Sequence, residues 1–90
     1  MKILQAPKFE KTYKKLQANQ RSDVDSAIRK IVENPMIGEL KAGDLSHLRV
    51  YKFKMAKQLT LIAYQHEKDT LIIILIAVGP HENFYRDLKR

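Results

Sequence analysis

An unbroken apolar run near the end of the chain restricts the fold more than any other feature. Leu71–Val78 has eight consecutive apolar residues, with Asp69 before it and Gly79-Pro80 after it. A membrane-spanning helix needs about 20 apolar residues, so the run predicts a strand buried on both faces at the centre of a sheet. Alternation divides its side chains between two faces, with Ile72, Ile74 and Ile76 on one and Ile73, Leu75 and Ala77 on the other.

Three other segments have the composition of strands. Leu48–Met55 alternates, so that aromatic and apolar side chains face one way while two lysines face the other. Leu59–Gln65 is rich in aliphatic residues and predicts a further strand, and Met1–Gln5 predicts a short one. The segment Met36–Ser46, which contains two glycines, predicts a loop.

Two helices are predicted between the first strand and this loop. Pro7 suits the first turn of a helix, where its missing N–H costs nothing. A second helix is predicted to begin near Ser22, with Asp25 three residues later as in a capping box, and to end at Asn34-Pro35. The last ten residues, from His81, are compatible with a short helix or a ragged tail.

This order of elements predicts a single α+β domain over residues 1–90. An N-terminal strand and a helical hairpin would pack on a small twisted antiparallel sheet. The chain has no cysteine, which excludes disulfides and thiolate zinc sites. The N-terminus has no apolar core of a signal peptide, so a cytoplasmic protein is expected.

The net charge points to an anionic partner. Seventeen Lys and Arg oppose ten Asp and Glu, which gives +7. A small domain this basic is expected to meet nucleic acid, a ribosomal surface or an acidic protein segment, although lysines also serve solubility alone. The first predicted helix carries a group of lysines: Lys8, Lys11, Lys14 and Lys15.

Two groups of residues are candidates for chemistry. Lys52 and Lys54 project from the same side of a strand, about 7 Å apart, and are suited to share an anion; a solvated outer face is the alternative. His81, Tyr85 and Arg86 follow the end of the apolar strand, where functional side chains often collect. They supply a proton-transfer group, a stacking ring and a phosphate ligand, or else they cap the core. The histidines lack metal-ligand spacing, so no metal and no cofactor are expected.

Several of these segments together resemble a known family. The sheet segments are Tyr51-Lys52-Phe53-Lys54, Leu61-Ile62-Ala63-Tyr64-Gln65 and Leu75-Ile76-Ala77-Val78-Gly79. They resemble the sheet of RelE-type toxins in the RelE/ParE superfamily, which are the toxins of type II toxin–antitoxin systems. His81 with Tyr85 after that glycine resembles the C-terminal active-site segment of the superfamily, especially its YafQ-like branch.

The resemblance implies a metal-independent, ribosome-dependent endoribonuclease that cleaves mRNA and inhibits translation. In such enzymes the RNA 2′-hydroxyl attacks its own phosphate. Lys52 and Lys54 match the paired strand lysines, which would act as base and phosphate ligands. His81 matches a position that is histidine in the YafQ-like branch and would be the acid or base, and Tyr85 matches the aromatic residue that positions the nucleotide.

The resemblance also implies partners and leaves alternatives open. The lysines of the first helix would hold ribosomal RNA, with further RNA contacts from Arg49, Lys57 and Arg86, and an acidic antitoxin would cover the domain. RelE has an arginine where this chain has Leu61, and Lys57 or Arg49 would have to compensate. This departure keeps open a ParE-like toxin that inhibits DNA gyrase without catalysis, as well as a basic RNA-binding module without toxicity.

Overall fold

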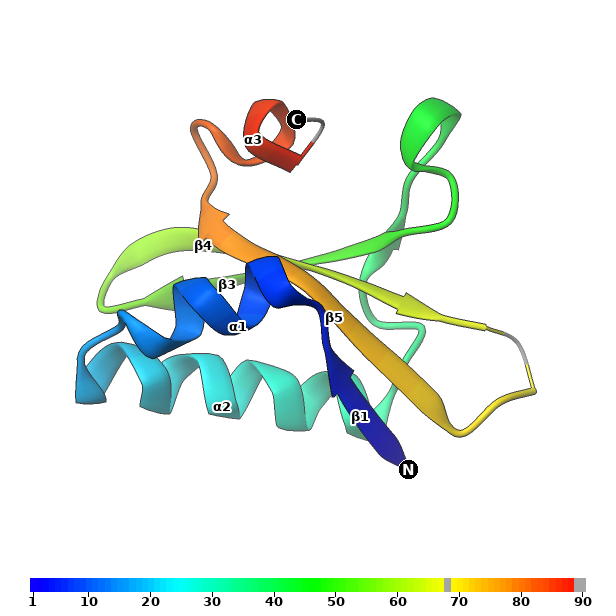
Figure 1. Ribbon diagram of the computed structural model, residues 1–90, viewed down its shortest axis with the longest axis horizontal. Coiled ribbons are helices and arrows are strands. Elements are labelled where there is room, and N and C mark those ends of the chain that lie inside the picture. The colour runs from blue at the N-terminus through cyan, green and yellow to red at the C-terminus, as the bar shows by residue number, and fades with distance from the viewer. Residues whose placement is uncertain (68, 89–90) are drawn as a thin grey trace.

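The computed structural model describes residues 1–67 and 69–88 and has a sheet between two unequal helical layers. A helical hairpin covers one face of the sheet, while a short C-terminal helix and a long loop rise from the other (Figure 1). The α+β class predicted from the sequence is confirmed. The elements are β1 (Lys2–Gln5), α1 (Pro7–Lys14), α2 (Ala18–Glu33), β2 (Glu39–Leu40), the 3-10 turn η1 (Gly43–Leu45), β3 (Arg49–Met55), β4 (Gln58–His66), β5 (Ile72–Pro80) and α3 (Phe84–Leu88).

The sheet has five strands in the order β1-β5-β4-β3-β2. β1 pairs with β5 in parallel and the other neighbours are antiparallel, so the sheet is mixed rather than antiparallel throughout. The parallel pair arises because the helical hairpin and three further strands separate β1 from β5 in the chain. The middle strand is β4, whereas the sequence predicted that the apolar run would be central. β5 is an interior strand, but Ile72 at its start is 41% exposed, because it borders an open groove on the sheet face that the hairpin does not cover.

A β-bulge changes which side chains of β5 share a face. The register shifts between Ala63 and Tyr64, which pair with Ala77 and Leu75, so Ile76 is an extra residue. One unpaired residue reverses the alternation beyond it. Ala77 therefore packs in the same cluster as Ile76, and not with Ile73 and Leu75 as strict alternation predicted.

The helical hairpin builds the larger part of the core. Phe9 of α1 and Val24, Ala27 and Ile31 of α2 are buried against the sheet. α2 begins at Ala18 rather than near Ser22, because Gln17 and Gln20 form the reciprocal capping box one turn earlier. The partner residues on the sheet belong to the same cluster: Met55, Ile62, Tyr64, Ile73, Leu75 and Val78.

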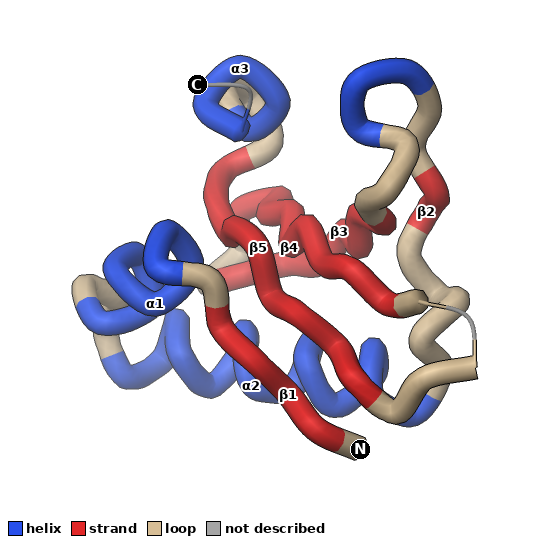
Figure 2. The backbone as a smooth tube through the Cα atoms, turned by 45° about the vertical axis from the view of Figure 1, so that its right-hand side comes forward, coloured by secondary structure: helices blue, strands red, loops and turns tan. Residues whose placement is uncertain are grey.

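The opposite side of the sheet, called here the distal face, carries a second and smaller core. Phe84 of α3 is buried there against residues of the strands and the loop: Leu48, Val50, Leu61, Ala63 and Ala77. The C-terminal segment is thus a helix up to Leu88, and residues 89–90 lie outside the described residues. Figure 2 shows α3 and the loop with η1 standing apart above the sheet.

The loop after α2 is anchored by a buried tyrosine. The Tyr64 hydroxyl donates to the carbonyl of Pro35 at 2.6 Å and accepts from the N–H of Gly38 at 2.9 Å. Part of the segment predicted as loop, Glu39–Leu40, pairs with β3 as an additional edge strand. The two bonds fix where the chain returns to the sheet. They therefore position the loop of residues 39–48, called here the loop wall, beside the distal face.

Candidate functional site

Lys52 and Lys54 lie on the distal face and are exposed. Residues that pair across neighbouring strands form a row. Lys52 lies in a row with Leu61 and Gly79, and Lys54 pairs with Leu59 two residues further along the sheet. The neighbouring Tyr51 and Phe53 pack toward the helical hairpin, as the alternation predicted. The two ammonium groups therefore stand on the side of the sheet that the hairpin leaves free.

His81 continues the row of Lys54. Its backbone N–H donates to the carbonyl of Leu59 at 3.2 Å, and Leu59 pairs with Lys54 on the other side. Strands lie about 4.8 Å apart, so His81 and Lys54 are separated by roughly 10 Å of backbone. A lysine side chain can span most of this distance, which allows both groups to reach one phosphate. His81 is exposed and borders a shallow hollow of about 180 Å³ with Leu59 and Glu82.

Tyr85 lies on α3 and meets a lysine that the sequence did not single out. Its ring stands edge-on to Phe84, with centroids 5.5 Å apart, and is half-buried. The Lys41 ammonium lies 5.2 Å from the centroid of the Tyr85 ring. Polar contact with the Tyr85 hydroxyl, helped by the Glu39 carboxylate, raises the pKa of Lys41 above its ordinary value although burial opposes this. Lys41 is a loop residue without a repeating pattern around it, so the sequence held no signal for this contact.

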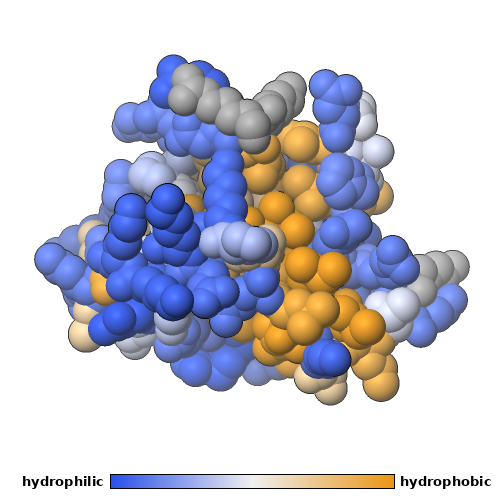
Figure 3. Space-filling model, in the orientation of Figure 1, coloured by the Kyte–Doolittle hydropathy of each residue, from blue (hydrophilic) through white to orange (hydrophobic). Residues whose placement is uncertain are grey.

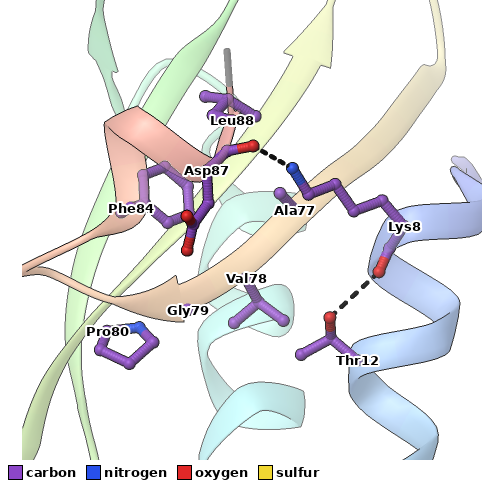
Figure 4. A pocket seen from close by; sticks show the side chains of 9 residues that line it. All are labelled: Lys8, Thr12, Ala77, Val78, Gly79, Pro80, Phe84, Asp87 and Leu88. Carbon is purple, nitrogen blue, oxygen red and sulfur yellow. Dashed lines mark hydrogen bonds between the residues drawn. The ribbon is translucent and has the colours of Figure 1, made fainter. Parts of the chain in front are cut away.

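Lys8, predicted to bind RNA, is exposed and makes a contact within the protein. Its ammonium donates to the backbone carbonyl of Asp87 near the end of α3. The two helices enclose a cavity of about 250 Å³ above the end of β5, with Lys8 reaching across it (Figure 4). Val78 and Gly79 form its floor. The structure thus assigns Lys8 a contact that ties α1 to α3.

Lys11 and Lys14 of α1, with Lys15 at its C-terminal end, form a separate basic surface. Lys14 pairs with Glu10 at 3.0 Å, and both side chains are well exposed. Lys11 and Lys15 are exposed and border a shallow depression beside Pro7. This group is carried by the hairpin, whereas Lys52 and Lys54 are carried by the sheet.

The remaining cations differ in what they can reach. The Arg49 guanidinium donates to the carbonyls of Gly38 at 2.8 Å and Met36 at 3.4 Å. Arg49 also alternates with Val50 and so lies on the hairpin side of the sheet, away from Lys52. Lys57 is exposed in the turn between β3 and β4, with a φ of 72°.

Two further positions were named from the sequence: Arg86 as an RNA contact, and Leu61 as the place of a missing arginine. Arg86 is exposed on α3 and donates to the Asn83 Oδ1 at 3.0 Å. Leu61, at the position where RelE-type toxins carry an arginine, is fully buried and packs in the cluster that holds Phe84. Lys52, Lys54 and His81 therefore gather at one end of the distal face, and Tyr85 with Lys41 forms a second group.

The distal face also has an apolar part. Figure 3 shows an apolar patch over β1 and the first half of β5. A groove of about 250 Å³ runs between Leu4, Ile72 and Ile74, with Gln65 and Glu67 at its polar side. Within residues 1–67 and 69–88, no three His, Cys, Asp or Glu side chains are grouped to hold a metal ion. The helices of this part are too short or too polar to cross a bilayer.

Residues 3–89 match the family of ParE-like toxins of type II bacterial toxin-antitoxin systems. No curated protein matches the sequence. The structure is similar to the toxin in the intact E. coli RelBE toxin–antitoxin complex, with a TM-score of 0.69, 21% identity, and 90% of this chain and 96% of that chain covered. It is also similar to the isolated E. coli RelE toxin, with a TM-score of 0.67, 21% identity, and 99% of this chain and 96% of that chain covered. For the YoeB/ParE toxin from Agrobacterium tumefaciens the TM-score is 0.71 and the identity 16%, with 90% of this chain and 99% of that chain covered. At these identities the likenesses establish the fold.

Proposed function

The chain belongs to the ParE-like toxins of type II bacterial toxin–antitoxin systems, and we propose that it acts as an endoribonuclease that cleaves mRNA on the ribosome without a metal ion. One observation carries this proposal. Lys54 and His81 occupy the same row at one end of the distal face, and Lys52 projects from the same side of β3 two residues away. Non-catalytic binding to gyrase does not require a proton-transfer group beside positive charge, so this arrangement favours the ribonuclease.

The chemistry needs three things at a phosphate: a base for the 2′-hydroxyl, positive charge on the oxygens, and an acid for the leaving 5′-oxygen. We assign the first two roles to Lys52 and Lys54: one lysine, in its neutral form, takes the 2′-hydroxyl proton, and the other stays charged, because charge placed where negative charge develops is the largest catalytic term in many enzymes. Histidine titrates near neutrality and suits the proton donor to the 5′-oxygen. The products are a 2′,3′-cyclic phosphate and a free 5′-hydroxyl, so no water or oxidant is consumed.

An acidic protein antitoxin is the proposed partner. One of the similar structures is a toxin–antitoxin complex. The apolar groove beside Leu4, Ile72 and Ile74 lies at the start of β5, and Lys52, Lys54 and His81 lie toward the other end of the same face. An extended segment with apolar side chains at one end and acidic side chains at the other fits both. Such a segment would cover Lys52 and Lys54 and so block access of RNA.

The test compares single variants expressed without antitoxin. His81→Ala should lower cleavage of ribosome-bound mRNA by about 10²–10⁴, and Lys52→Ala and Lys54→Ala should each lower it less, because neighbouring lysines substitute in part. Lys30→Ala, on the exposed side of α2, is the control for loss of one charge. Cleavage is read by primer extension and folding by thermal unfolding. Wild-type cleavage by His81→Ala would show that the site is wrong.

The buried Leu61 supports a second candidate. Because this position offers no phosphate ligand, the chain could instead poison DNA gyrase as a ParE-like toxin does. The same induction experiment separates the two functions. Growth arrest with DNA breaks that depend on gyrase, and with intact mRNA, would replace the ribonuclease by the gyrase poison.

A further inference from the structure

Lys41 holds a fixed place at the loop wall of the distal face. Its backbone N–H donates to the carbonyl of Leu48 at 3.0 Å, directly after the pair formed by Leu40 and Arg49. The backbone therefore continues the edge strand, and only the side chain is free to change position. That side chain is 21% exposed and points to Tyr85 rather than to solvent.

The present partners of the Lys41 ammonium bind it weakly. It lies over the Tyr85 ring at 5.2 Å and within 3.4 Å of the Glu39 carboxylate, whose side chain is 68% exposed. An ion pair with an exposed carboxylate contributes little, and a cation–π contact is weaker than a charge-assisted hydrogen bond to a phosphate. A phosphate arriving at Tyr85 would therefore take the ammonium from both partners.

No other cation among the described residues is shown in contact with Tyr85. Leu61 is buried, and Arg49 is bonded to carbonyls on the hairpin side. The positive charge that an arginine at position 61 would bring to this face must come from another element. Lys41 offers a charge from across the face, where its ammonium lies against the Tyr85 ring.

We propose that Lys41 is an RNA-binding residue which grips the phosphate of the nucleotide whose base stacks on Tyr85. In the free protein the ammonium covers one face of the ring. On binding it moves to the phosphate, and the ring face it leaves receives the base. This proposal rests on the ribonuclease function and deepens it, since it names the residue that holds the substrate beside the catalytic group.

The experiment measures binding separately from cleavage. The probe is a ribosome carrying mRNA with a 2′-deoxy nucleotide at the cleavage position, which binds but lacks the attacking hydroxyl. Lys41→Met should weaken binding about tenfold or more and reduce the log–log salt slope by about 0.7, the value for one phosphate contact on a single strand. On cleavable mRNA, KM should rise while kcat changes little. Lys41→Arg should restore the affinity for the probe and the salt slope, because the guanidinium keeps the charge.

Two further variants distinguish binding from a structural role. Glu39→Gln removes the competing carboxylate and should tighten binding in the presence of Lys41, with no effect in Lys41→Met. Lys30→Met is the control for a lost charge elsewhere. Unchanged affinity and salt slope in Lys41→Met would overturn the proposal, as would a loss of affinity matched by a loss of thermal stability. Wild-type protein that binds the probe but does not cleave mRNA would refute the ribonuclease alone, and wild-type protein that does not bind it would refute both.

Discussion

Tyr64 links the two halves of the molecule through its hydroxyl. The residue is fully buried in β4, and its hydroxyl donates to the carbonyl of Pro35 and accepts from the N–H of Gly38. These groups belong to the loop that carries Lys41 toward Tyr85. A Cβ on Gly38 would lie 2.8 Å from the Tyr64 ring and hydroxyl, so glycine is required for the close approach. The position of the loop wall therefore depends on one tyrosine and one glycine.

Replacement of Tyr64 by phenylalanine should destabilise the fold without leaving a cavity. The Gly38 N–H loses its acceptor inside the protein, and an unsatisfied buried donor costs about 1–3 kcal/mol. Urea unfolding should show this loss in the free energy of unfolding. Tyr51→Phe is the matched control, because no hydrogen bond of the Tyr51 hydroxyl occurs among the described residues. Equal stabilities of the two variants would contradict the role of the hydroxyl.

Alkaline pH should unfold the protein in part through the same tyrosine. Burial raises the pKa of Tyr64 above the ordinary value of 10.0, and the Gly38 amide and the Arg49 charge offset only part of this. Since the raised pKa belongs to the folded state, the stabilisation is complete below that ordinary value and is lost as pH rises through the folded pKa. The free energy of unfolding should fall with pH above about 10, and less steeply in Tyr64→Phe. A remaining slope is expected from Tyr13, whose pKa the hydrogen bond to Asp25 also raises. Parallel pH profiles of wild type and variant would rule out this contribution.

At the scale of elements, α3 depends on what holds it. Its five residues are too few to form a stable helix alone. Phe84 anchors it to the distal face, and Lys8 donates to the Asp87 carbonyl at its end. The last carbonyls of a helix lack partners within it, so a cation there satisfies one of them and favours the helix dipole. The tilt of α3 sets the position of Tyr85.

Lys8→Met should release α3 while the rest of the domain stays folded. The expected loss of global stability is at most about 1 kcal/mol, but amide exchange in residues 84–88 should become faster because this segment opens locally. Lys8→Arg should keep most of the protection, and Lys14→Met, on the exposed side of α1, is the control. If residues 84–88 exchange at the same rate in wild type and Lys8→Met, α3 is held by Phe84 alone.

The elements also show which features a sequence pattern can predict. The strands were predictable because alternation is local, and Lys52 and Lys54 lie on the face opposite Tyr51 and Phe53, as predicted. The bulge at Ile76 was not predictable, because it depends on the register with β4. The start of α2 was predicted near Ser22 and lies at Ala18, because the capping box is formed by Gln17 and Gln20, and glutamine is a weaker capping signal than serine. Lys41 and Tyr85 are 44 residues apart in sequence, and only the folded sheet brings them together.

At the scale of the whole molecule, two basic surfaces compete for the role of ribosome contact. One is on α1, with Lys11 and Lys15 exposed, and the other is on the distal face, with Lys52 and Lys54. They stand on different layers of the fold (Figure 1). The ribosome is a large polyanion and can meet both, with α1 on ribosomal RNA and the distal face on mRNA.

Salt dependence separates these surfaces because each phosphate contact releases counterions. The double variant Lys11→Ala and Lys15→Ala should reduce the log–log slope of ribosome affinity by about 1.4–1.8, which corresponds to two contacts. Binding to a short single-stranded RNA without the ribosome should be unaffected, because that RNA needs only the distal face. The double variant Lys52→Ala and Lys54→Ala should weaken binding to both. Lys14 is left unchanged, since its pair with Glu10 already uses part of its charge. Ribosome affinity and slope equal to wild type in the α1 variant would remove this helix from the interface and leave the distal face as the whole contact.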